Sequence, residues 1–353
     1  MTNLFALTLD ELTALLAGWG EPAYRARQIW TWLYDQRVSS FDAMTNLSKD
    51  LRERLATETR LGVLELVTER SSRDGTNKRL YRLEDGQLIE SVLMPYDDDR
   101  RTACISTQAG CAMGCVFCAT GQMGFARHLT AAEIFEQAVR FAQLLAAEGD
   151  RLSNVVLMGM GEPFHNYDES LAAIRRLMDD LGIGARHITV STVGLVPKIR
   201  QFADEGLQVR LAISLHAATD AERSALLPIN KRHDLAELLD ACRYYVEQTG
   251  RRITFEWALI AGENDTGDQA RQLGSLLEGL LCHVNLIPLN PTGGYEGKPS
   301  DPDAILRFIR ILESYNVPAT VRVRRGIDID AGCGQLKAAV IKKQGRGTVP
   351  DAG

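Results

Sequence analysis

Three cysteines of this chain stand close together in the sequence. They are Cys111, Cys115 and Cys118, spaced as C-x3-C-x2-C, and Phe117 comes just before the last of them. Cysteine thiolates hold iron–sulfur clusters in proteins, and a fully ligated [4Fe-4S] cluster takes four of them. Three thiolates on one short loop therefore predict a cluster in which one iron stays open to a small molecule.

Zinc and disulfide bonds are the alternative explanations of this triplet. A structural zinc site takes four Cys or His ligands at spacings such as C-x2-C, and His128 is the nearest histidine. Three adjacent cysteines cannot all pair with one another, and the chain total of seven is odd, which disfavours disulfides. The spacing and the ligand number favour the cluster, and zinc stays open as the alternative.

The triplet resembles the signature of the radical SAM superfamily. In that superfamily S-adenosylmethionine (SAM) chelates the open iron through its amino and carboxylate groups. An electron from the cluster then splits the sulfonium and releases a 5'-deoxyadenosyl radical. The resemblance therefore implies a [4Fe-4S] cluster and SAM as cofactors, and an electron donor such as flavodoxin or ferredoxin.

The composition is that of an ordinary globular protein. The chain has 353 residues, enough for one large domain and a smaller one, with 45% hydrophobic and 24% charged residues. The N-terminal stretch has no basic start and carries Asp10 and Glu11, so it does not resemble a signal peptide. No apolar stretch approaches the roughly 18 residues of a membrane span. We therefore expect a cytoplasmic protein with reduced cysteines and no membrane partner.

The net charge of the chain gives no sign of a nucleic-acid partner. It is -6 at pH 7, whereas a strongly basic total would have indicated nucleic-acid binding. Local basic groups occur at 231–232, at 251–252 and at Arg322, Arg324 and Arg325. Short groups of this kind are usually solvated surface, and we expect this of all three.

The N-terminal part of the chain is predicted to be helical. Thr8 and Glu11 form the pattern of a capping box ahead of a first helix. A second helix is expected over 22–34, and a third is expected to begin at about Ser48. We therefore expect a small helical domain over 1–60.

A β-rich connector is expected to follow these helices, over 61–95. Short β-prone runs fill 63–92, and Asp-Gly pairs at 74–75 and 85–86 interrupt them. Such pairs are typical of hairpin turns.

From about residue 101 the pattern becomes strand, loop and helix in repeated order. Apolar β-prone runs lie at 103–106, 155–158, 188–190, 209–213, 253–259 and 284–287. Helical stretches lie at 131–146, 168–181, 235–248 and 303–314. The alternation predicts βαβ units around a parallel sheet, and six units are too few for an eight-fold barrel. We expect an α/β fold with a partial (β/α)6 barrel of the radical SAM type over 96–343, followed by a disordered tail over 344–353.

Polar or small residues follow several of these strands at the point where each strand ends. Ligands of parallel α/β folds bind at the carboxyl ends of the strands. Gly161 lets the backbone approach a ligand, and Glu162 can accept hydrogen bonds from a ligand ammonium. The other strand-end residues are Ser191, Ser214, Leu215, His216 and Asn290. Each alone is most often a turn residue, but together with the cysteine triplet they predict a SAM site.

Four further cysteines lie outside the triplet. Cys333 is flanked by glycines, which indicates an exposed and flexible loop. Cys104 lies on the first barrel strand, seven residues before Cys111, and is expected to face the same end of the barrel or to be a small core residue. Cys242 and Cys282 are expected to be ordinary buried thiols.

Taken together, these motifs resemble the RlmN/Cfr family of RNA methyltransferases, and the similarity is greatest to its adenine-C2 branch. The resemblance covers essentially the whole chain before the tail. The motifs that carry it are Glu90, the Cys104 strand, the cysteine triplet and the segments 158–163, 214–216, 286–291 and 328–336.

The resemblance implies a reaction that uses two SAM molecules. One SAM methylates Cys333, and the radical from the second removes a hydrogen atom from that methyl group. The carbon radical attacks C2 of adenine, so that Cys333 joins protein and RNA covalently. Attack of Cys104 on the sulfur of Cys333 then releases the methylated base and leaves a transient disulfide. Glu90 matches a residue with an acid/base role, and a structural carboxylate is its alternative.

The implied substrates are 23S rRNA at the peptidyl-transferase centre and tRNA at the adenine following the anticodon. Two other functions stay open. One is the Cfr branch, which methylates C8 of the rRNA adenine, because the residues alone do not specify C2. The other is a non-catalytic metal-binding RNA module.

Overall fold

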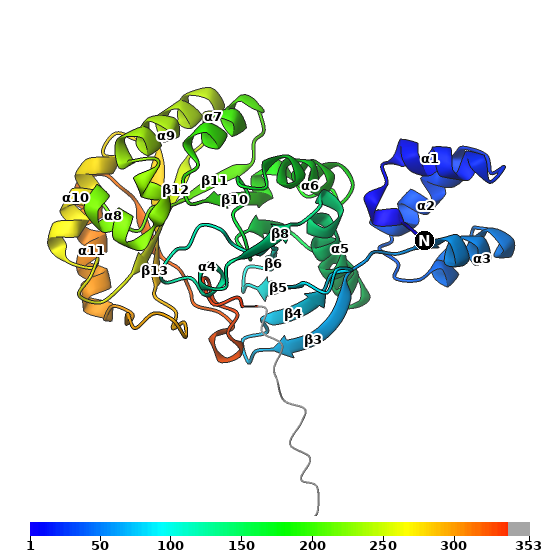
Figure 1. Ribbon diagram of the computed structural model, residues 1–353, viewed down its shortest axis with the longest axis horizontal. Helices are drawn as coiled ribbons and strands as arrows, with labels where there is room; N and C mark the ends of the chain where they lie inside the picture. Colours follow the sequence, from blue (N-terminus) through cyan, green and yellow to red (C-terminus); the bar gives the residue numbers. More distant parts are fainter. Residues whose placement is uncertain (338–353) are drawn as a thin grey trace, which may run out of the picture.

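A computed structural model gives the fold, and it describes residues 1–337. The end of the expected barrel segment, 338–343, and the expected tail, 344–353, lie outside the described residues. Three helices form the N-terminal part of the molecule, and one large curved sheet with helices around it forms the rest (Figure 1).

The expected N-terminal helices are present. They are α1 (Leu9–Gly18), α2 (Tyr24–Tyr34) and α3 (Lys49–Glu58). Thr8 and Glu11 form the predicted capping box, with the Glu11 carboxylate accepting from the Thr8 backbone N–H at 2.7 Å. Ser48 caps α3 through its side chain. A short parallel pair, β1 (Thr2–Asn3) and β2 (Thr59–Arg60), joins the two ends of this unit.

Ten strands form the main sheet, in the order β14-β13-β12-β11-β10-β9-β6-β5-β4-β3. The antiparallel part consists of β3 (Glu65–Ser71), β4 (Asn77–Arg82) and β5 (Leu88–Pro95), which pairs with β6 (Arg101–Cys104). The parallel part continues through β9 (Asn154–Leu157), β10 (Ile188–Thr192), β11 (Arg210–Ser214), β12 (Ile253–Leu259), β13 (Cys282–Pro288) and β14 (Ala319–Val321). The edge strands β14 and β3 are at opposite ends of this order, so the barrel is open.

Helices cover the outer side of the curved sheet (Figure 1). They include α5 (Ala131–Ala147), α6 (Tyr167–Asp179), α7 (Val196–Asp204), α9 (Leu235–Thr249), α10 (Gly267–Leu277) and α11 (Pro302–Ser314). Phe255 and Trp257 of β12 are fully buried, and Trp257 packs against Phe308 of α11. The expected partial α/β barrel is thus confirmed. Two features go beyond the expectation: β14 adds a seventh parallel strand, and the β-rich segment is continuous with the barrel sheet.

A buried carboxylate fixes the segment between the N-terminal helices and the sheet. Glu136 of α5 is fully buried and accepts hydrogen bonds from the backbone N–H of Val63 at 2.7 Å and of Leu64 at 3.0 Å. Arg140, one turn further on, pairs with Glu136 at 2.8 Å and donates to the carbonyl of Leu61. Buried polar contacts therefore hold the N-terminal helices against α5.

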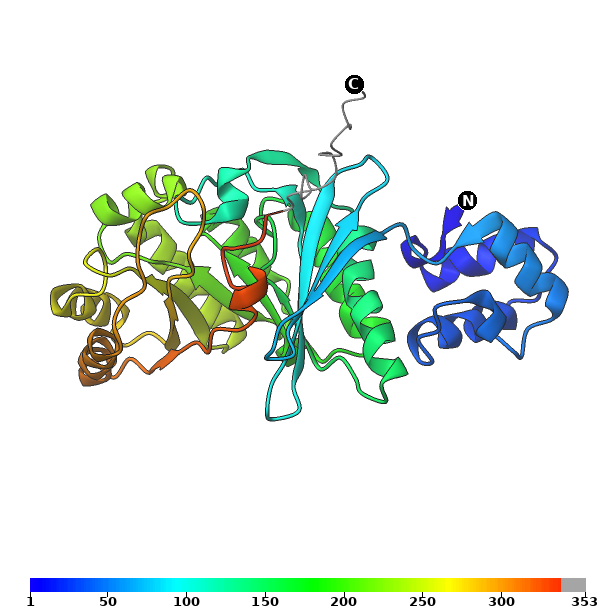
Figure 2. The same ribbon diagram turned by 90° about the horizontal axis from the view of Figure 1, so that it is seen from below.

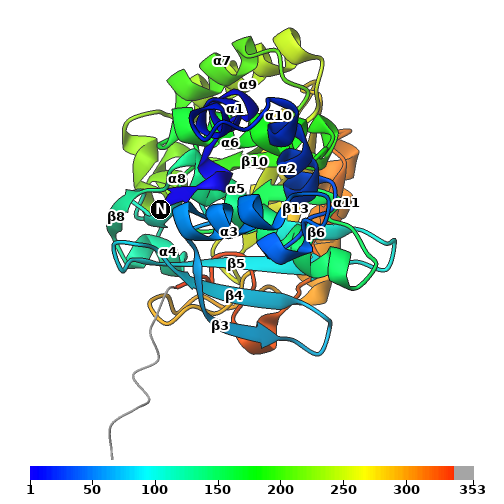
Figure 3. The same cartoon turned by 90° about the vertical axis from the view of Figure 1, so that its right-hand side faces the viewer.

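Aromatic side chains extend the same contact. Tyr34 of α2 packs against Phe135 of α5, with ring centroids 5.7 Å apart, and against Phe5 at 6.3 Å. Arg176 of α6 lies 4.1 Å from the centroid of Phe135 and donates to the Tyr34 hydroxyl at 2.9 Å. Figure 3, seen from the side of the N-terminal helices, shows them in front of the barrel.

Replacing Glu136 by alanine should lower the free energy of unfolding by about 3 kcal/mol. The change would leave the backbone N–H groups of Val63 and Leu64 and the half-buried Arg140 guanidinium without their acceptor. Chemical denaturation followed by circular dichroism measures the effect. The control is Glu53→Ala, which breaks an exposed pair with Lys49 at 3.5 Å and should change stability by less than about 0.5 kcal/mol. Equal effects would mean that the buried contact adds nothing beyond a surface pair.

Within the described residues, no helix is both long enough and apolar enough to cross a bilayer.

Candidate active site

The three clustered cysteines lie on the loop between β7 (Gln108–Gly110) and β8 (Phe125–His128). Cys111 follows β7 directly, and Cys118 occupies the N-cap position of the short helix α4 (Ala119–Gln122) without a side-chain capping bond. The loop is closed by hydrogen bonds from the N–H of Cys111 to the carbonyl of Gly124 at 2.8 Å and from the N–H of Cys118 to the carbonyl of Cys115 at 3.2 Å. The turn geometry therefore keeps the three side chains together.

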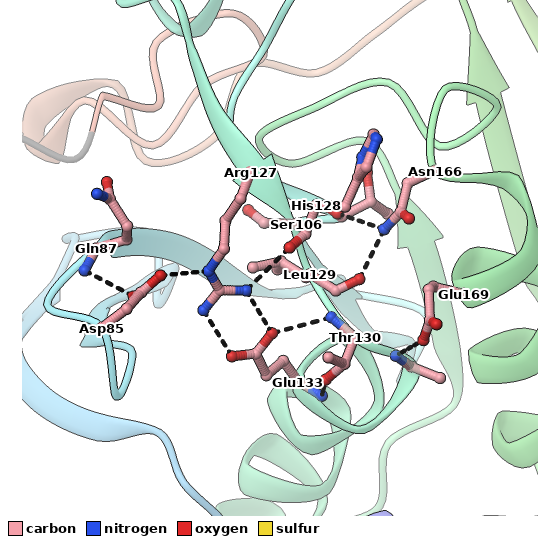
Figure 4. A network of polar contacts seen from close by, with 12 residues as sticks. Asp85, Gln87, Ser106, Arg127, His128, Leu129, Thr130, Glu133, Asn166 and Glu169 are labelled. Carbon is pink, nitrogen blue, oxygen red and sulfur yellow. Dashed lines mark hydrogen bonds and ion pairs between the residues drawn. The ribbon is translucent and has the colours of Figure 1, made fainter.

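A polar network fixes the chain that follows this loop (Figure 4). Arg127 of β8 donates to both carboxylate oxygens of Glu133 at 2.8 Å and also pairs with Asp85 of the β4–β5 turn. Asn166 donates to the carbonyls of Thr107 at 2.9 Å and Leu129 at 2.8 Å. Since β7 and β8 pair with each other, both ends of the cysteine loop are anchored.

The clustered cysteines face a cavity at the carboxyl ends of the barrel strands, which we call the cluster cavity. Its lining includes Cys111, Cys115, Cys118, Met158, Gly159, Gly161, Glu162, Ser191, Ser214, His216, Glu256, Asn290, Arg322 and Cys333. The structure therefore brings together all but one of the strand-end residues that the sequence predicted. The exception is Leu215, whose side chain is fully buried in the main core.

The chemistry of the three thiols fits an iron–sulfur cluster. Burial raises the pKa of Cys111 to about 12 and that of Cys115 well above its usual range, and the neighbouring thiols add to both shifts. Because burial disfavours the thiolate form, these cysteines can bind as thiolates only when a cation stabilises the negative charge, and the iron of a cluster is such a cation. Among residues 1–337, no three His, Cys, Asp or Glu side chains converge on the position of a single metal ion. A cluster, whose ligands bind separate irons, suits this spacing better than one zinc ion.

Glu162 lies in the cluster cavity as a buried carboxylate. It is 4% exposed and accepts hydrogen bonds from the backbone N–H of Val193 at 2.8 Å and Phe164 at 3.0 Å. Burial raises its pKa to about 7 despite these donors. A ligand ammonium beside this carboxylate would therefore gain a charged partner in a site with little water.

The glycines before Glu162 are needed for packing. A Cβ on Gly159 would lie 2.7 Å from the backbone of Ile105, and one on Gly161, at φ +104°, would lie 2.6 Å from the side chain of Gln108. Both contacts are far too short for a larger residue. The glycines let the end of β9 approach the chain that leads into the cysteine loop, and Gly161 still lines the cavity.

His216 forms a neutral wall of the cluster cavity. Its Nδ1 accepts a hydrogen bond from the N–H of Ala258 at 2.8 Å, and its ring packs edge-on against Phe117 at 4.9 Å. Burial, with Arg223 nearby, lowers its pKa to about 3. His216 therefore shapes the site and does not serve as an acid or base near neutral pH.

A second cavity adjoins the first, and we call it the thiol cavity. Cys104 of β6 and Cys333 both line it, and Cys333 lines the cluster cavity as well. Burial raises the pKa of Cys104 to about 12, and the pKa of Cys333 is also raised by burial, with Arg322 opposing the shift. Both alternatives for Cys104 hold, because it lines this cavity and is also a buried member of the main core. Cys242 and Cys282 are buried free thiols, as expected.

The prediction of an exposed Cys333 loop is wrong. Cys333 is half-buried, and the Asn290 side chain donates to its carbonyl at 3.1 Å. The N–H of Ala119 donates to the carbonyl of Gly334 at 2.8 Å, and the Thr120 hydroxyl donates to the carbonyl of Leu336 at 2.6 Å. The flanking glycines serve close packing, since a Cβ on Gly332 would lie 2.7 Å from Asn290.

Arg322 is the site residue that the sequence analysis missed. It was expected to be solvated, but its side chain is 20% exposed and lines both cavities. It lies 3.9 Å from the carboxylate of Glu256, which receives a hydrogen bond from Asn285 at 2.8 Å. Arg322 directly follows β14, so the strand-end rule would have found it had that short strand been recognised.

Glu90 lies outside the lining of both cavities. Its carboxylate pairs with Lys78 at 3.2 Å and accepts from the backbone N–H of Lys337 at 2.9 Å. Burial raises its pKa, and Lys78 opposes that shift. These contacts hold the chain that follows Cys333 and correspond to a structural carboxylate.

Comparison with known proteins agrees with this geometry. Residues 2–61 match the family described as the ribosomal RNA large subunit methyltransferase N-terminal domain, and residues 105–272 match the radical SAM superfamily. The chain is 56% identical over 347 residues to the dual-specificity RNA methyltransferase RlmN 1 of Myxococcus xanthus, covering 98% of this chain and 96% of the relative. It is 48% identical over 340 residues to a probable RlmN of Bacillus subtilis, covering 95% and 93%. The crystal structure of a radical SAM methyltransferase from Sphaerobacter thermophilus is similar with a TM-score of 0.92 and 52% identity, covering 96% of this chain and 100% of that one.

Proposed function

The chain belongs to the RlmN family of radical SAM RNA methyltransferases, and we propose that it methylates C2 of adenine in 23S rRNA and in tRNA. The adenines are those at the peptidyl-transferase centre and following the anticodon. The observation that carries this proposal is that Cys104 and Cys333 face one cavity, which adjoins the cavity of the clustered cysteines. A methyl carrier and a thiol that releases the product need this arrangement.

Members of the superfamily use SAM and an iron–sulfur cluster, and we propose a [4Fe-4S] cluster on Cys111, Cys115 and Cys118. When bound, the cluster and SAM supply the electron and the radical that removes a hydrogen atom. Glu162 holds the SAM ammonium, and neutral His216 limits the pocket. The other proposed SAM contacts are Gly161, Ser191, Ser214, Leu215 and Asn290, of which Leu215 reaches the ligand only through its backbone. A flavodoxin or ferredoxin is the proposed electron donor.

Cys333 is proposed as the methyl carrier and Cys104 as the thiol that releases the product. The sulfur of Cys333 first takes a methyl group from SAM. After that methyl group has lost a hydrogen atom, its carbon bonds to C2 of adenine, and the adduct gives up the C2 proton and one electron, which the cluster, when bound, would take back. The Cys104 thiolate then attacks the sulfur of Cys333, and a disulfide forms as the carbon–sulfur bond breaks. The electron pair of that bond stays on the RNA carbon, which takes up a proton and becomes the methyl group. Arg322, beside both thiols, stabilises their thiolate forms.

Glu90 is proposed for the proton transfer at C2, with a structural role as its alternative. Its contacts with Lys78 and the N–H of Lys337 favour the alternative. Glu90→Gln keeps the shape and the acceptor for the N–H of Lys337 but removes the charge that pairs with Lys78, so a purely structural role predicts lower thermal stability without accumulation of adduct. Accumulation of unreleased RNA adduct by Glu90→Gln would support the acid/base role.

Mass spectrometry of nucleosides tests the position of the new methyl group. RNA from a deletion strain that carries this chain should regain 2-methyladenosine in 23S rRNA and in tRNA. The same strain with Cys333→Ala should regain none, because the carrier is missing. Recovery of 8-methyladenosine would support the C8 branch, and no modified adenosine with the intact chain would support a non-catalytic module.

Peptide mapping tests the methyl carrier. Protein produced with its cluster intact should carry one additional methyl group, and the fragments should assign it to Cys333. The signal should be absent from Cys111→Ala if carrier methylation depends on the loaded site. A methyl group on Cys104 instead, or on neither thiol during turnover, would contradict the two-step scheme.

A further inference from the structure

Arginines surround the opening of the thiol cavity. Arg324 and Arg325 line it together with the exposed Val323, on the segment that follows β14. We infer that Arg324, Arg325 and Tyr96 form the surface that holds the phosphate backbone of the RNA beside the target nucleotide. The inference rests on the proposed function, because it requires RNA to approach Cys104 and Cys333 through this opening.

Two arginines stack on Tyr96 at this opening. The guanidinium carbon of Arg325 lies 4.7 Å from the centroid of the Tyr96 ring, and that of Arg100 lies 4.5 Å from it. Tyr96 belongs to the β5–β6 turn, whose N–H to carbonyl bond with Arg100 is 2.9 Å long. A stacked guanidinium has lost much of its freedom while its N–H edge stays available for two parallel bonds to a phosphate.

The charges of Arg324 and Arg325 are not neutralised by an ion pair, whereas Arg100 pairs with Asp98 at 2.8 Å. Arg324 is exposed and Arg325 half-buried, and neither has an ion-pair partner within residues 1–337. The Nε of Arg325 is buried without a hydrogen-bond acceptor. Some other surface arginines are paired, such as Arg54 with Glu58 at 2.7 Å and Arg82 with Glu65 at 2.8 Å, and others, such as Arg307 and Arg310, are not, so it is the position at the thiol cavity that distinguishes Arg324 and Arg325. On a chain of net charge -6, an unpaired basic group at this opening is a specific attraction for an anion such as a phosphate.

The interior of the cavity indicates how the RNA is presented. Much of its wall is apolar, with Met94, Met158 and Ile287, and Arg322, Asn290 and both thiols line it as well. An apolar wall accepts the face of a base, but a base inside a helix cannot reach it without leaving its stack. The partner is therefore an RNA segment whose adenine is unpaired and turned out, with its flanking phosphates on the arginines.

The segment that carries the arginines is held firmly enough to act as such a surface. The N–H of Gly326 donates to Asp74 at 2.9 Å, and the Ser72 hydroxyl donates to Asp328 at 2.5 Å. Figure 2 shows this segment, in red, lying beside the blue strands of the antiparallel part of the sheet. The β3–β4 turn thus holds the segment that carries Arg324 and Arg325 in place.

The test compares two double variants that each remove two positive charges. One is Arg324→Ala with Arg325→Ala. The control is Arg307→Ala with Arg310→Ala, two exposed residues of α11 on the outer side of the sheet. Binding of a transcribed tRNA is measured for the full chain with its cofactors at several salt concentrations, and thermal unfolding confirms that each variant is folded.

The variant at the opening should bind tRNA about 10- to 100-fold more weakly, and its slope of log K against log salt should be smaller in magnitude by about 1.4, or roughly 0.7 for each lost contact to a single strand. The control should bind like the parent chain. If the double variant does not fold, Arg324→Ala alone, at an exposed and unpaired position, should show about half of that reduction in the salt slope.

Unchanged affinity and salt slope in the variant at the opening, or an equal loss in the control, would overturn the inference. The proposed function would survive that result as long as the parent chain still forms 2-methyladenosine. If the parent chain forms none, the proposed function fails, whatever the arginine variants show.

Discussion

Cys104→Ala should accumulate protein that is covalently attached to RNA, and Cys333→Ala should accumulate none. Both thiols line one cavity, but only Cys333 is proposed to bond to the nucleotide. A thiol that only resolves an intermediate is not needed to form it. Without Cys104 the reaction should therefore stop after the adduct, and turnover should be lost. Denaturing gels with labelled RNA would show the adduct as a slow band.

The double substitution and a distant cysteine are the controls for this asymmetry. Cys104→Ala with Cys333→Ala should behave like Cys333→Ala, because no adduct can form. Cys282→Ala, at a buried position outside both cavities, should show no band and ordinary turnover. A slow band from Cys333→Ala would reverse the two roles. No band from Cys104→Ala with its cluster intact would reject the covalent scheme.

Replacing any one of Cys111, Cys115 or Cys118 by alanine should abolish both iron loading and SAM cleavage. Each is proposed as one of three protein ligands, and the other thiol of the cluster cavity, Cys333, is held in its own loop by Asn290. The loaded parent chain should hold about four irons with sulfide. Iron and sulfide analysis and chromatography of 5'-deoxyadenosine measure the two losses.

The outcome also separates the cluster from zinc. One zinc ion per chain without sulfide would favour the zinc alternative and remove the basis for radical chemistry. Full SAM cleavage by any one of the three variants would contradict the ligand assignment. Cys282→Ala should keep its iron and its SAM cleavage, because this thiol lies outside the cluster cavity.

Much of the fold could be predicted because apolar β-prone runs and helical patterns are clear in the sequence. The strand at 253–259 was predicted with the bounds it has, and the helix expected over 131–146 ends one residue later. The strand β14 was missed because it has only three residues and is partly exposed, so it has no apolar run. The place of the antiparallel strands in the barrel sheet depends on pairing between β5 and β6, which no local pattern encodes.

The sequence predicted those site residues that lie in a recognisable motif or at the carboxyl end of a recognisable strand. The rule for parallel strands brought Glu162, Ser214 and Asn290 to one cavity. It failed for Leu215, because strand-end position alone does not determine which way a side chain points. The burial of Arg322 and the anchoring of the Cys333 loop depend on contacts between segments distant in the chain, such as the bond between Asn290 and Cys333.

The hydrogen bonds between α4 and the Cys333 loop couple the docking of that loop to the binding of the cofactor. Ala119 and Thr120 come directly after Cys118, and their bonds to Gly334 and Leu336 link a proposed cluster ligand to the loop of the proposed methyl carrier. Whatever favours the docked loop then favours cofactor binding by the same factor, and the reverse holds as well. RNA that draws Cys333 away from α4 would therefore weaken the hold on the cofactor, so that substrate affinity and cofactor affinity are thermodynamically linked.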